Sequence, residues 1–199
     1  MNKLAIVGAE ESTRNNAPYD DPDFDIWAIS NYANAPWMLR CDAIIEIHRA
    51  PIYTYHPLDH DYWHYLQTTD KVVYMLSGHS DIKGARLYPL QEIKDELLSN
   101  IRVHGEEIEN FGSSLDYAIA LALYQGYTEI EIYGCEMRDK QEYILQQPSF
   151  TFWVGLMAGR GVNIEMNCTE GIFDRPLYGR AMLDDLSKHV AFLSVEIQE

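Results

Sequence analysis

The stretch Gly112–Glu136, GSSLDYAIALALYQGYTEIEIYGCE, decides the fold because it contains one helix and one strand in succession. Its Gly-Ser-Ser start, an apolar stripe at helical spacing and a stop at Gly126 predict a helix over about Ser113–Gln125. The run Glu129–Tyr133 is short and rich in isoleucine and ends at Gly134, which predicts a buried strand. A helix that leads directly into a strand is typical of an α/β protein with crossover connections.

Further apolar runs outside this block predict the other strands of a parallel sheet. They are Leu4–Val7, Asp25–Ser30, Asp42–Ile47, Lys71–Leu76 and Gly161–Met166. A second amphipathic helix is predicted over about Leu90–Leu98. We therefore expect one Rossmann-like α/β domain over residues 1–199, with a mostly parallel sheet flanked by helices. The segment Ala50–Thr69 is rich in His, Tyr and Pro, and we expect an irregular excursion or a lid there.

The composition excludes several classes of partner. The 199 residues include 15 basic and 31 acidic side chains, which give a formal net charge of −16. Nucleic-acid backbones and acidic membranes need clustered Lys and Arg, so we expect no nucleic-acid and no membrane partner. Three cysteines without CxxC spacing fit a reducing compartment, and no stretch is long enough for a secretory signal or a membrane span. We therefore expect a cytoplasmic protein, and leave open whether it forms a homo-oligomer.

Open parallel sheets bind ligands beyond the carboxyl ends of their strands, and many polar residues of this sequence fall there. The candidates for contacts to a nucleotide follow a strand or begin the helix quoted above: Gly8, Ser12, Arg14, Ser30, Asn31, Ser113, Ser114, Gly134 and Glu136. A helix N-terminus favours an anion because its N–H groups and its dipole point outward. Each residue also has a plain structural alternative: Ser113 caps its helix, for example, or Asn31 forms a turn. Their common position at one edge favours a ligand site.

Two further groups of residues are candidates for chemistry at this edge. His48 follows the strand Asp42–Ile47 and is the candidate general base, because histidine changes its charge near neutral pH. Its alternative role is to satisfy a loop carbonyl. Glu10 and Glu11 are candidate ligands for Mg²⁺ beside a phosphate, because Mg²⁺ prefers oxygen ligands. Their alternative is to be ordinary solvated carboxylates.

The block Gly112–Glu136 resembles the serine- and glycine-capped helix, the G-Y-x-E-I strand and the G-x-D/E end of bacterial sialyltransferases. The same pattern occurs in the related DUF115 family, which includes archaeal hydroxymethyl-dihydropterin pyrophosphokinases. The opening Ile6–Ser12 is similar to their I-x-G-N-G-P-S-L loop, although Glu10-Glu11 replaces its Gly-Pro. Phe24–Asn31 is similar to their short strand ending in Asn, and Gln147–Met166 to their closing helix–strand unit. The arrangement also resembles small bacteriophage proteins.

The resemblance implies a nucleotide held between the first loop, Asn31 and the serine-capped helix. In the sialyltransferases this nucleotide is CMP-sialic acid, and in the pyrophosphokinases it is ATP with magnesium. The sialyltransferases place a catalytic histidine after the G-x-D strand, whereas Met137–Gln147 contains none and has Tyr143 in that neighbourhood. Tyr143 is therefore a candidate, beside His48, for handling the acceptor proton.

Functions of different classes remain open for this sequence. The first is a nucleotide-dependent transferase of glycosyltransferase or pyrophosphokinase type, with a nucleotide or sugar nucleotide as ligand and Mg²⁺ as a candidate cofactor. The second is a non-catalytic module that binds or sequesters a nucleotide, such as a phage accessory protein. A third is an assembly protein without any ligand. Only the first turns over a labelled nucleotide substrate.

Overall fold

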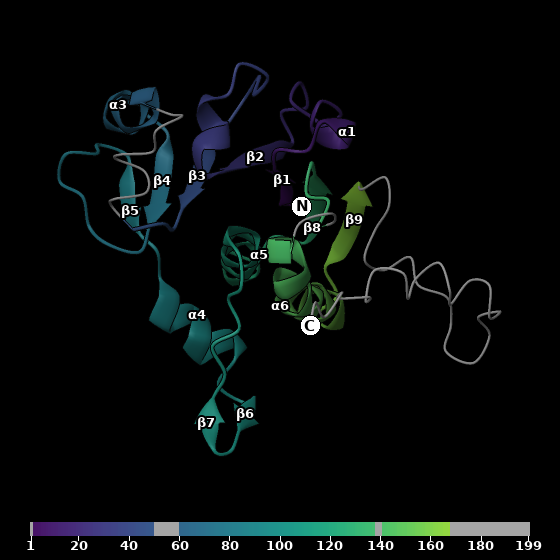
Figure 1. Cartoon of the computed structure of the whole chain (residues 1–199). Helices are drawn as coiled ribbons and strands as arrows, with labels where there is room; N and C mark the ends of the chain where they lie inside the picture. The colour runs from purple at the N-terminus through teal and green to yellow at the C-terminus, as the bar shows by residue number, and fades with distance from the viewer. Residues whose placement is uncertain (1, 50–59, 138–140, 168–199) are drawn as a thin grey trace, which may run out of the picture.

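The computed structural model describes residues 2–49, 60–137 and 141–167 (Figure 1). Seven strands of this part of the chain form one parallel sheet in the order β5-β4-β3-β2-β1-β8-β9, which confirms the predicted fold class. The strands are β1 (Lys3–Val7), β2 (Phe24–Ile29), β3 (Ala43–Glu46), β4 (Val72–Met75), β5 (Ala85–Leu87), β8 (Glu129–Tyr133) and β9 (Asn163–Asn167). A separate antiparallel hairpin consists of β6 (Arg102–Val103) and β7 (Glu106–Glu107).

Helices connect the strands and cover the sheet. They are α1 (Glu11–Arg14), the 3₁₀ helix η1 (Ser30–Asn34), α3 (His60–Thr68), α4 (Leu90–Leu97), α5 (Ser114–Tyr124) and α6 (Gln141–Gly159). None of these helices has both the length and the apolar character that a membrane crossing requires. The predicted single domain extends to residue 199, and residues 168–199 lie outside the described part of the chain.

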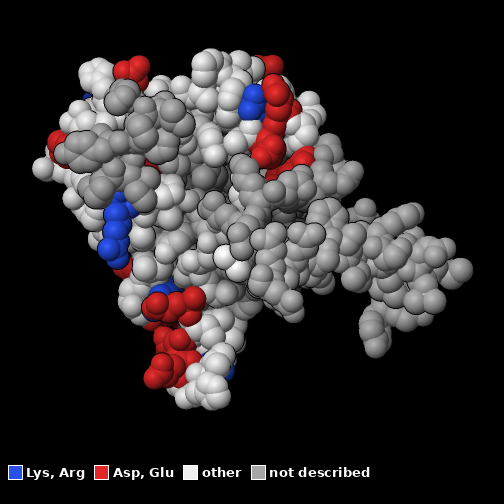
Figure 2. Space-filling view, in the orientation of Figure 1, with Lys and Arg blue, Asp and Glu red and all other residues white. Residues whose placement is uncertain are grey.

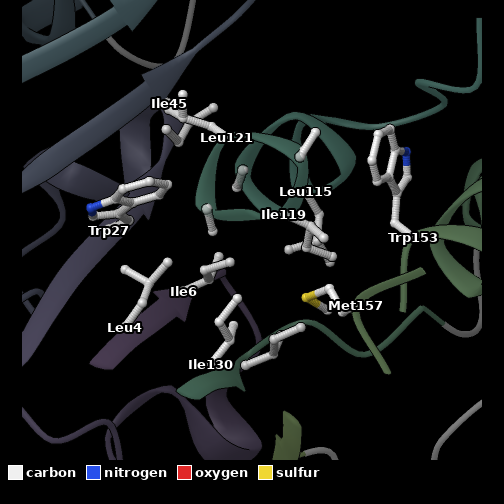
Figure 3. Packing of buried hydrophobic residues seen from close by; sticks show 14 of the residues in the cluster. Leu4, Ile6, Trp27, Ile45, Leu115, Ile119, Leu121, Ile130, Trp153 and Met157 are labelled. Atoms are coloured by element: carbon white, nitrogen blue, oxygen red, sulfur yellow. The ribbon is translucent and has the colours of Figure 1, made fainter. Parts of the chain in front are cut away.

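Each face of the sheet has its own core, because successive side chains of a strand point to opposite faces. Leu4 and Ile6 of β1 belong to the largest hydrophobic cluster together with Ile119 of α5 and Trp153 of α6 (Figure 3). On the other face, Tyr62 of α3 belongs to a second cluster with alternate residues of β2, β3 and β4. Helices on both faces explain why the strands are apolar throughout.

The order in which the chain adds strands to the sheet reverses at β1. Val7 at the end of β1 lies opposite Ala28 of β2 on one side and Tyr133 of β8 on the other. The first part of the chain builds outward through β2, β3, β4 and β5, and the second part builds in the opposite direction through β8 and β9. Open α/β sheets bind ligands at the carboxyl ends of the strands around such a reversal.

Helix α5 lies where the sequence predicts it, and its two ends show why. The Ser113 side chain accepts a hydrogen bond from the N–H of Asp116, whose carboxylate in turn accepts the N–H of Ser113 at 2.9 Å. Gly126 follows the helix with a φ of +78°, a conformation that glycine adopts without steric cost. Since α5 precedes β8 in a parallel sheet, its N-terminus lies at the carboxyl edge of the strands.

The expectations from sequence are corrected at α3, at β5 and at the β6–β7 hairpin, and the short helices α1 and η1 were not expected either. The segment that we expected to be irregular contains α3, whose Tyr62 and Leu66 are buried, while residues 50–59 lie outside the described part. The many His and Tyr residues of α3 conceal this helical spacing. Strand β5 and the β6–β7 hairpin were also not predicted, because they have only three and two residues per strand.

Candidate functional site

A buried carboxylate, that of Glu46, lies at the carboxyl end of β3 and has close polar neighbours. Glu46 is 0 % exposed. Its Oε2 accepts hydrogen bonds from the hydroxyl of Ser30 at 2.6 Å and from that of Tyr62 at 2.7 Å. Its Oε1 accepts the backbone N–H of His48 at 3.1 Å and lies 2.7 Å from Nδ1 of the His48 ring. We call these four residues the Glu46 cluster.

The donors around Glu46 explain how a charge can be buried there. A carboxylate in a protein interior is stable only where hydrogen bonds or an opposite charge replace its water. Burial, together with the neighbouring Glu46 carboxylate, raises the pKa of Tyr62 well above its ordinary value. The Tyr62 hydroxyl therefore keeps its proton and remains a donor to Glu46.

The contact with Glu46 also determines what the ring of His48 can do. An ionised carboxylate only accepts hydrogen bonds, so a neutral ring that donates to Glu46 through Nδ1 has its lone pair on Nε2. The His48 side chain is 33 % exposed, whereas that of Glu46 is fully buried. The pair therefore connects the interior of the sheet to its carboxyl edge. Carboxylate–imidazole pairs of this kind serve as general bases.

Ser30 adopts an unusual backbone conformation within the Glu46 cluster. Its φ is +49°, and its Oγ lies 3.4 Å from Nδ1 of His48 as well as next to Glu46. A left-handed conformation costs a residue with a Cβ of order 1 kcal/mol, and such residues concentrate at functional sites. The structure thus brings together two residues of the predicted site, Ser30 and His48. Asn31 follows in η1, at the same edge.

The loops after β1 and β8 touch each other directly. Backbone hydrogen bonds of 2.9 Å join Gly8 N to Tyr133 O and Glu10 N to Gly134 O. A Cβ at Gly8 would lie 2.5 Å from Gly134 O, and one at Gly134 would lie 2.8 Å from Gly8 O. Both glycines are predicted nucleotide contacts, and each has the opposite loop as its near neighbour.

Arg14 is held by the first loop and by an aromatic ring. Its guanidinium donates to the carbonyl of Ala9, lies 3.3 Å from the carboxylate of Glu11 and covers the ring of Trp37 at 4.4 Å from the centroid. The Arg14 side chain is 17 % exposed. These contacts stabilise the loop and α1, and its predicted contact to a nucleotide remains a prediction.

Several acidic residues surround α1, and Figure 2 shows them on the surface beside it. The hydroxyl of Ser12 donates a hydrogen bond to the carboxylate of Glu136, which joins two predicted site residues across the β1 and β8 loops. Across the described residues, no three His, Cys, Asp or Glu side chains converge as the ligands of a metal ion do. A Mg²⁺ site at Glu10 and Glu11 therefore remains a prediction.

The partial positive charge at the N-terminus of α5 is already partly neutralised by the carboxylate of Asp116. Oδ2 of the buried Asp116 accepts hydrogen bonds from Gly112 N at 2.7 Å and from the Ser149 hydroxyl at 2.6 Å, besides that from Ser113. Burial raises the pKa of Asp116, and these hydrogen bonds oppose the rise. Ser113 is engaged as the cap, so Ser114 at the first helical position is the better placed hydroxyl for a ligand.

Tyr143 lies in the first turn of α6, and its half-buried ring packs against the largest core cluster. Because α6 follows β8, its first turn lies near the carboxyl edge. The predicted residues thus form four groups near this edge: those around Glu46, those in the touching loops, those at the start of α5, and Tyr143 at the start of α6.

Sequence reasoning did not include Glu46 and Tyr62 in the site. Glu46 had a detectable signal, since it is a charged residue that closes the apolar strand run two positions before His48. Tyr62 had none, because it lies in the segment that we expected to be irregular. Glu46 contacts the predicted residues Ser30 and His48, and Tyr62 contacts Glu46.

Comparison with known proteins gives matches in structure and none in sequence. No family model matches the chain, and no curated protein matches it significantly. The sialyltransferase CstII from Campylobacter jejuni, in complex with CMP-3FNeuAc, matches with a TM-score of 0.53 and 15 % identity over 86 % of this chain and 82 % of that one. The chain shares the fold of this sialyltransferase.

A second solved structure supports the same assignment of fold. The α-2,3-sialyltransferase from Campylobacter jejuni in its apo form matches with a TM-score of 0.52 and 17 % identity, over 86 % of this chain and 77 % of that one. At such identities the likeness concerns the fold alone. It confirms the resemblance to sialyltransferases at that level, and the resemblance to the DUF115 family and to bacteriophage proteins remains a prediction.

Proposed function

We propose that the protein is a transferase that uses a nucleotide sugar as donor and binds it at the carboxyl edge of the sheet. The observation that carries the proposal is the Glu46–His48 pair, which places an imidazole at the end of β3 in a sheet with a sialyltransferase fold. Ser30, with its left-handed backbone, supports the assignment because such conformations concentrate at functional sites.

In the proposed reaction, Nε2 of His48 removes the proton from an acceptor hydroxyl. The acceptor oxygen forms a bond to the anomeric carbon of the sugar, and the bond from that carbon to the phosphate oxygen of the nucleotide breaks. The nucleotide leaves with the electron pair of this bond, and the proton stays on His48. The protein contributes mainly orientation of the two substrates and a base in the correct protonation state.

The nucleotide is proposed to lie between the loop after β1, Asn31 and the start of α5. Ser114 would donate to a phosphate oxygen, since Ser113 is occupied as the helix cap. A cytidine nucleotide is the first ligand to test, because CstII was solved in complex with CMP-3FNeuAc. Tyr143 is the second candidate for the acceptor proton, and Glu10 and Glu11 are the candidate ligands if Mg²⁺ takes part.

Calorimetric titration and a turnover assay test the proposal together. CMP, UMP, GMP and ATP are each titrated into the protein, once with Mg²⁺ and once with EDTA. In the turnover assay, the release of CMP from CMP-linked sugars is followed. We expect CMP to bind, and His48→Gln to lower turnover by about 10²–10⁴-fold with its affinity for CMP nearly unchanged. Binding without turnover would favour the sequestering module, and turnover of ATP would favour the pyrophosphokinase. A chain that binds none of these nucleotides contradicts the proposal.

A further inference from the structure

We propose that Glu46, Ser30 and Tyr62 are positioning residues that select the Nδ1–H tautomer of His48 and so keep Nε2 as its basic nitrogen. The selection itself follows from the geometry of the Glu46 cluster. Only its kinetic consequence rests on the proposed function.

The two carboxylate oxygens of Glu46 have different hydrogen-bond partners. Oε2 accepts the hydroxyls of Ser30 and Tyr62, at 2.6 and 2.7 Å, so the carboxylate group is held at this end. Among the described residues, Oε1 contacts His48, through the backbone N–H at 3.1 Å and Nδ1 at 2.7 Å. A ring with its lone pair on Nδ1 would direct that lone pair at a carboxylate oxygen. The cluster therefore disfavours the Nε2–H tautomer.

Two separate elements, η1 and α3, supply the residues that hold this carboxylate at the end of β3. Ser30 begins η1, with the backbone strain described above, and Tyr62 comes from α3 on the face of the sheet to which Glu46 points. Tyr62 is 2 % exposed and is buried beside Leu66, so its hydroxyl has a fixed position. An apolar residue could fill the place of Glu46 without the desolvation cost of a buried charge, which is several kcal/mol. The carboxylate is thus better explained by its action on His48 than by packing.

Nuclear magnetic resonance reports the tautomer directly. In protein with ¹⁵N-labelled histidine, long-range ¹H–¹⁵N correlation spectra are recorded at a pH of about 8.5, two units above the ordinary histidine pKa. The His48 signals are assigned by their loss in His48→Gln. We expect a protonated Nδ1 and an unprotonated Nε2 in the unmodified protein. A protonated Nε2 on His48 overturns the proposal, whether or not the chain has any activity.

The double variant Glu46→Met/Tyr62→Phe removes the carboxylate together with a donor that would otherwise be left unpaired. Such apolar replacement of a buried polar pair is often tolerated. In this variant we expect His48 to change to the Nε2–H tautomer, with the Ser30 hydroxyl free to donate to Nδ1. A folded double variant that keeps the Nδ1–H tautomer contradicts the role of Glu46. If the variant does not fold, the spectrum of the unmodified protein still decides the matter.

Kinetics test the consequence of the tautomer. We expect the double variant to lose about 10²–10⁴-fold in kcat with little change in KM, since the wrong tautomer removes the base without touching the substrates. Tyr62→Phe alone should keep the Nδ1–H tautomer and lose about tenfold in kcat, the effect of one hydrogen bond to a charged group. An unchanged kcat in Tyr62→Phe removes Tyr62 from the proposal. A protein without turnover refutes the proposed function but leaves the tautomer to the spectra.

Discussion

Gly8 and Gly134 have no Cβ, and this allows the loops after β1 and β8 to touch. Gly134 also has a φ of +61°, and a Cβ there would lie within 3.0 Å of Glu10 O and of the Arg14 side chain. The near neighbours of Gly134 therefore belong to the first loop and its helix. The position of every candidate residue in these loops depends on this close approach.

Gly134→Ala is expected to destabilise the protein by about 3 kcal/mol or more, because it combines left-handed strain with overlap in a packed region. Gly161→Ala is the matched control, since Gly161 has a similar φ of +79° and a Cβ there would meet nothing within 4 Å. That variant should lose only the conformational part, about 1–2 kcal/mol. Urea unfolding of the two variants measures the difference. Equal losses would mean that the loops can separate at no cost.

The residues of the site differ in how far their sequence reveals them. Ser30 and His48 could be selected because each follows an apolar strand, and parallel strands bring such positions to one edge. Glu46 lies two positions before His48 on the same side of the strand, so the sequence indicates their proximity, but the hydrogen bond from Tyr62 to Glu46 could not be predicted because Tyr62 belongs to a helix whose spacing was concealed. Sequence periodicity indicates where a strand ends, and it does not give the direction of an individual carboxylate.

At the scale of elements, the start of α5 separates a structural serine from a candidate ligand-binding serine. Ser113→Ala should lower the free energy of unfolding by about 1 kcal/mol, because the N–H of Asp116 loses its side-chain partner. Ser114→Ala should change stability by less than about 0.5 kcal/mol, as expected for a half-exposed helix position. If Ser114 donates to a phosphate, its loss should weaken CMP binding about tenfold or more.

Thermal unfolding and calorimetric titration of both variants distinguish these roles. Ser114→Ala with unchanged CMP affinity would exclude the start of α5 from the nucleotide site. Ser113→Ala with unchanged stability would show that Asp116 alone sustains the cap.

Helix α5 and strand β8 were predicted to within about a residue, whereas α3 was missed. The difference has a physical cause. The α5–β8 block has strong end signals in Ser113 and Gly126, and its apolar residues outnumber its polar ones. In α3, the buried positions Tyr62 and Leu66 are separated by polar and aromatic residues, so the helical period is weak. Tertiary packing against the sheet stabilises α3 more than its own sequence does.

Over the whole molecule, the net charge of −16 opposes the approach of an anion. Figure 2 shows acidic side chains gathered over the β6–β7 hairpin as well as beside α1, so the negative charge extends over distant parts of this face. A nucleotide ligand carries negative phosphate. Long-range repulsion should therefore slow its association at low ionic strength.

The association rate constant of CMP is accordingly expected to rise when ionic strength increases from about 0.01 M to about 0.15 M, because the Debye length falls from about 30 Å to about 8 Å. Stopped-flow fluorescence can follow binding through the four tryptophans. Uncharged cytidine is the control, and its rate constant should not change. A rate constant for CMP that falls with salt would mean that a local basic field at the carboxyl edge determines the encounter.

The position of β1 has a consequence for how the chain is made. β1 leaves the ribosome before the other strands of its sheet, yet one of its two neighbours comes from residues synthesised much later, as the hydrogen bond between Lys3 and Glu129, 126 positions apart, shows. Until β8 and α5 emerge, one edge of β1 and the apolar face with Leu4 and Ile6 have no cover. Exposed strand edges and apolar faces favour aggregation during synthesis. A nascent chain stalled before α5 should therefore need a chaperone, whereas one released after β8 has the partners that β1 requires.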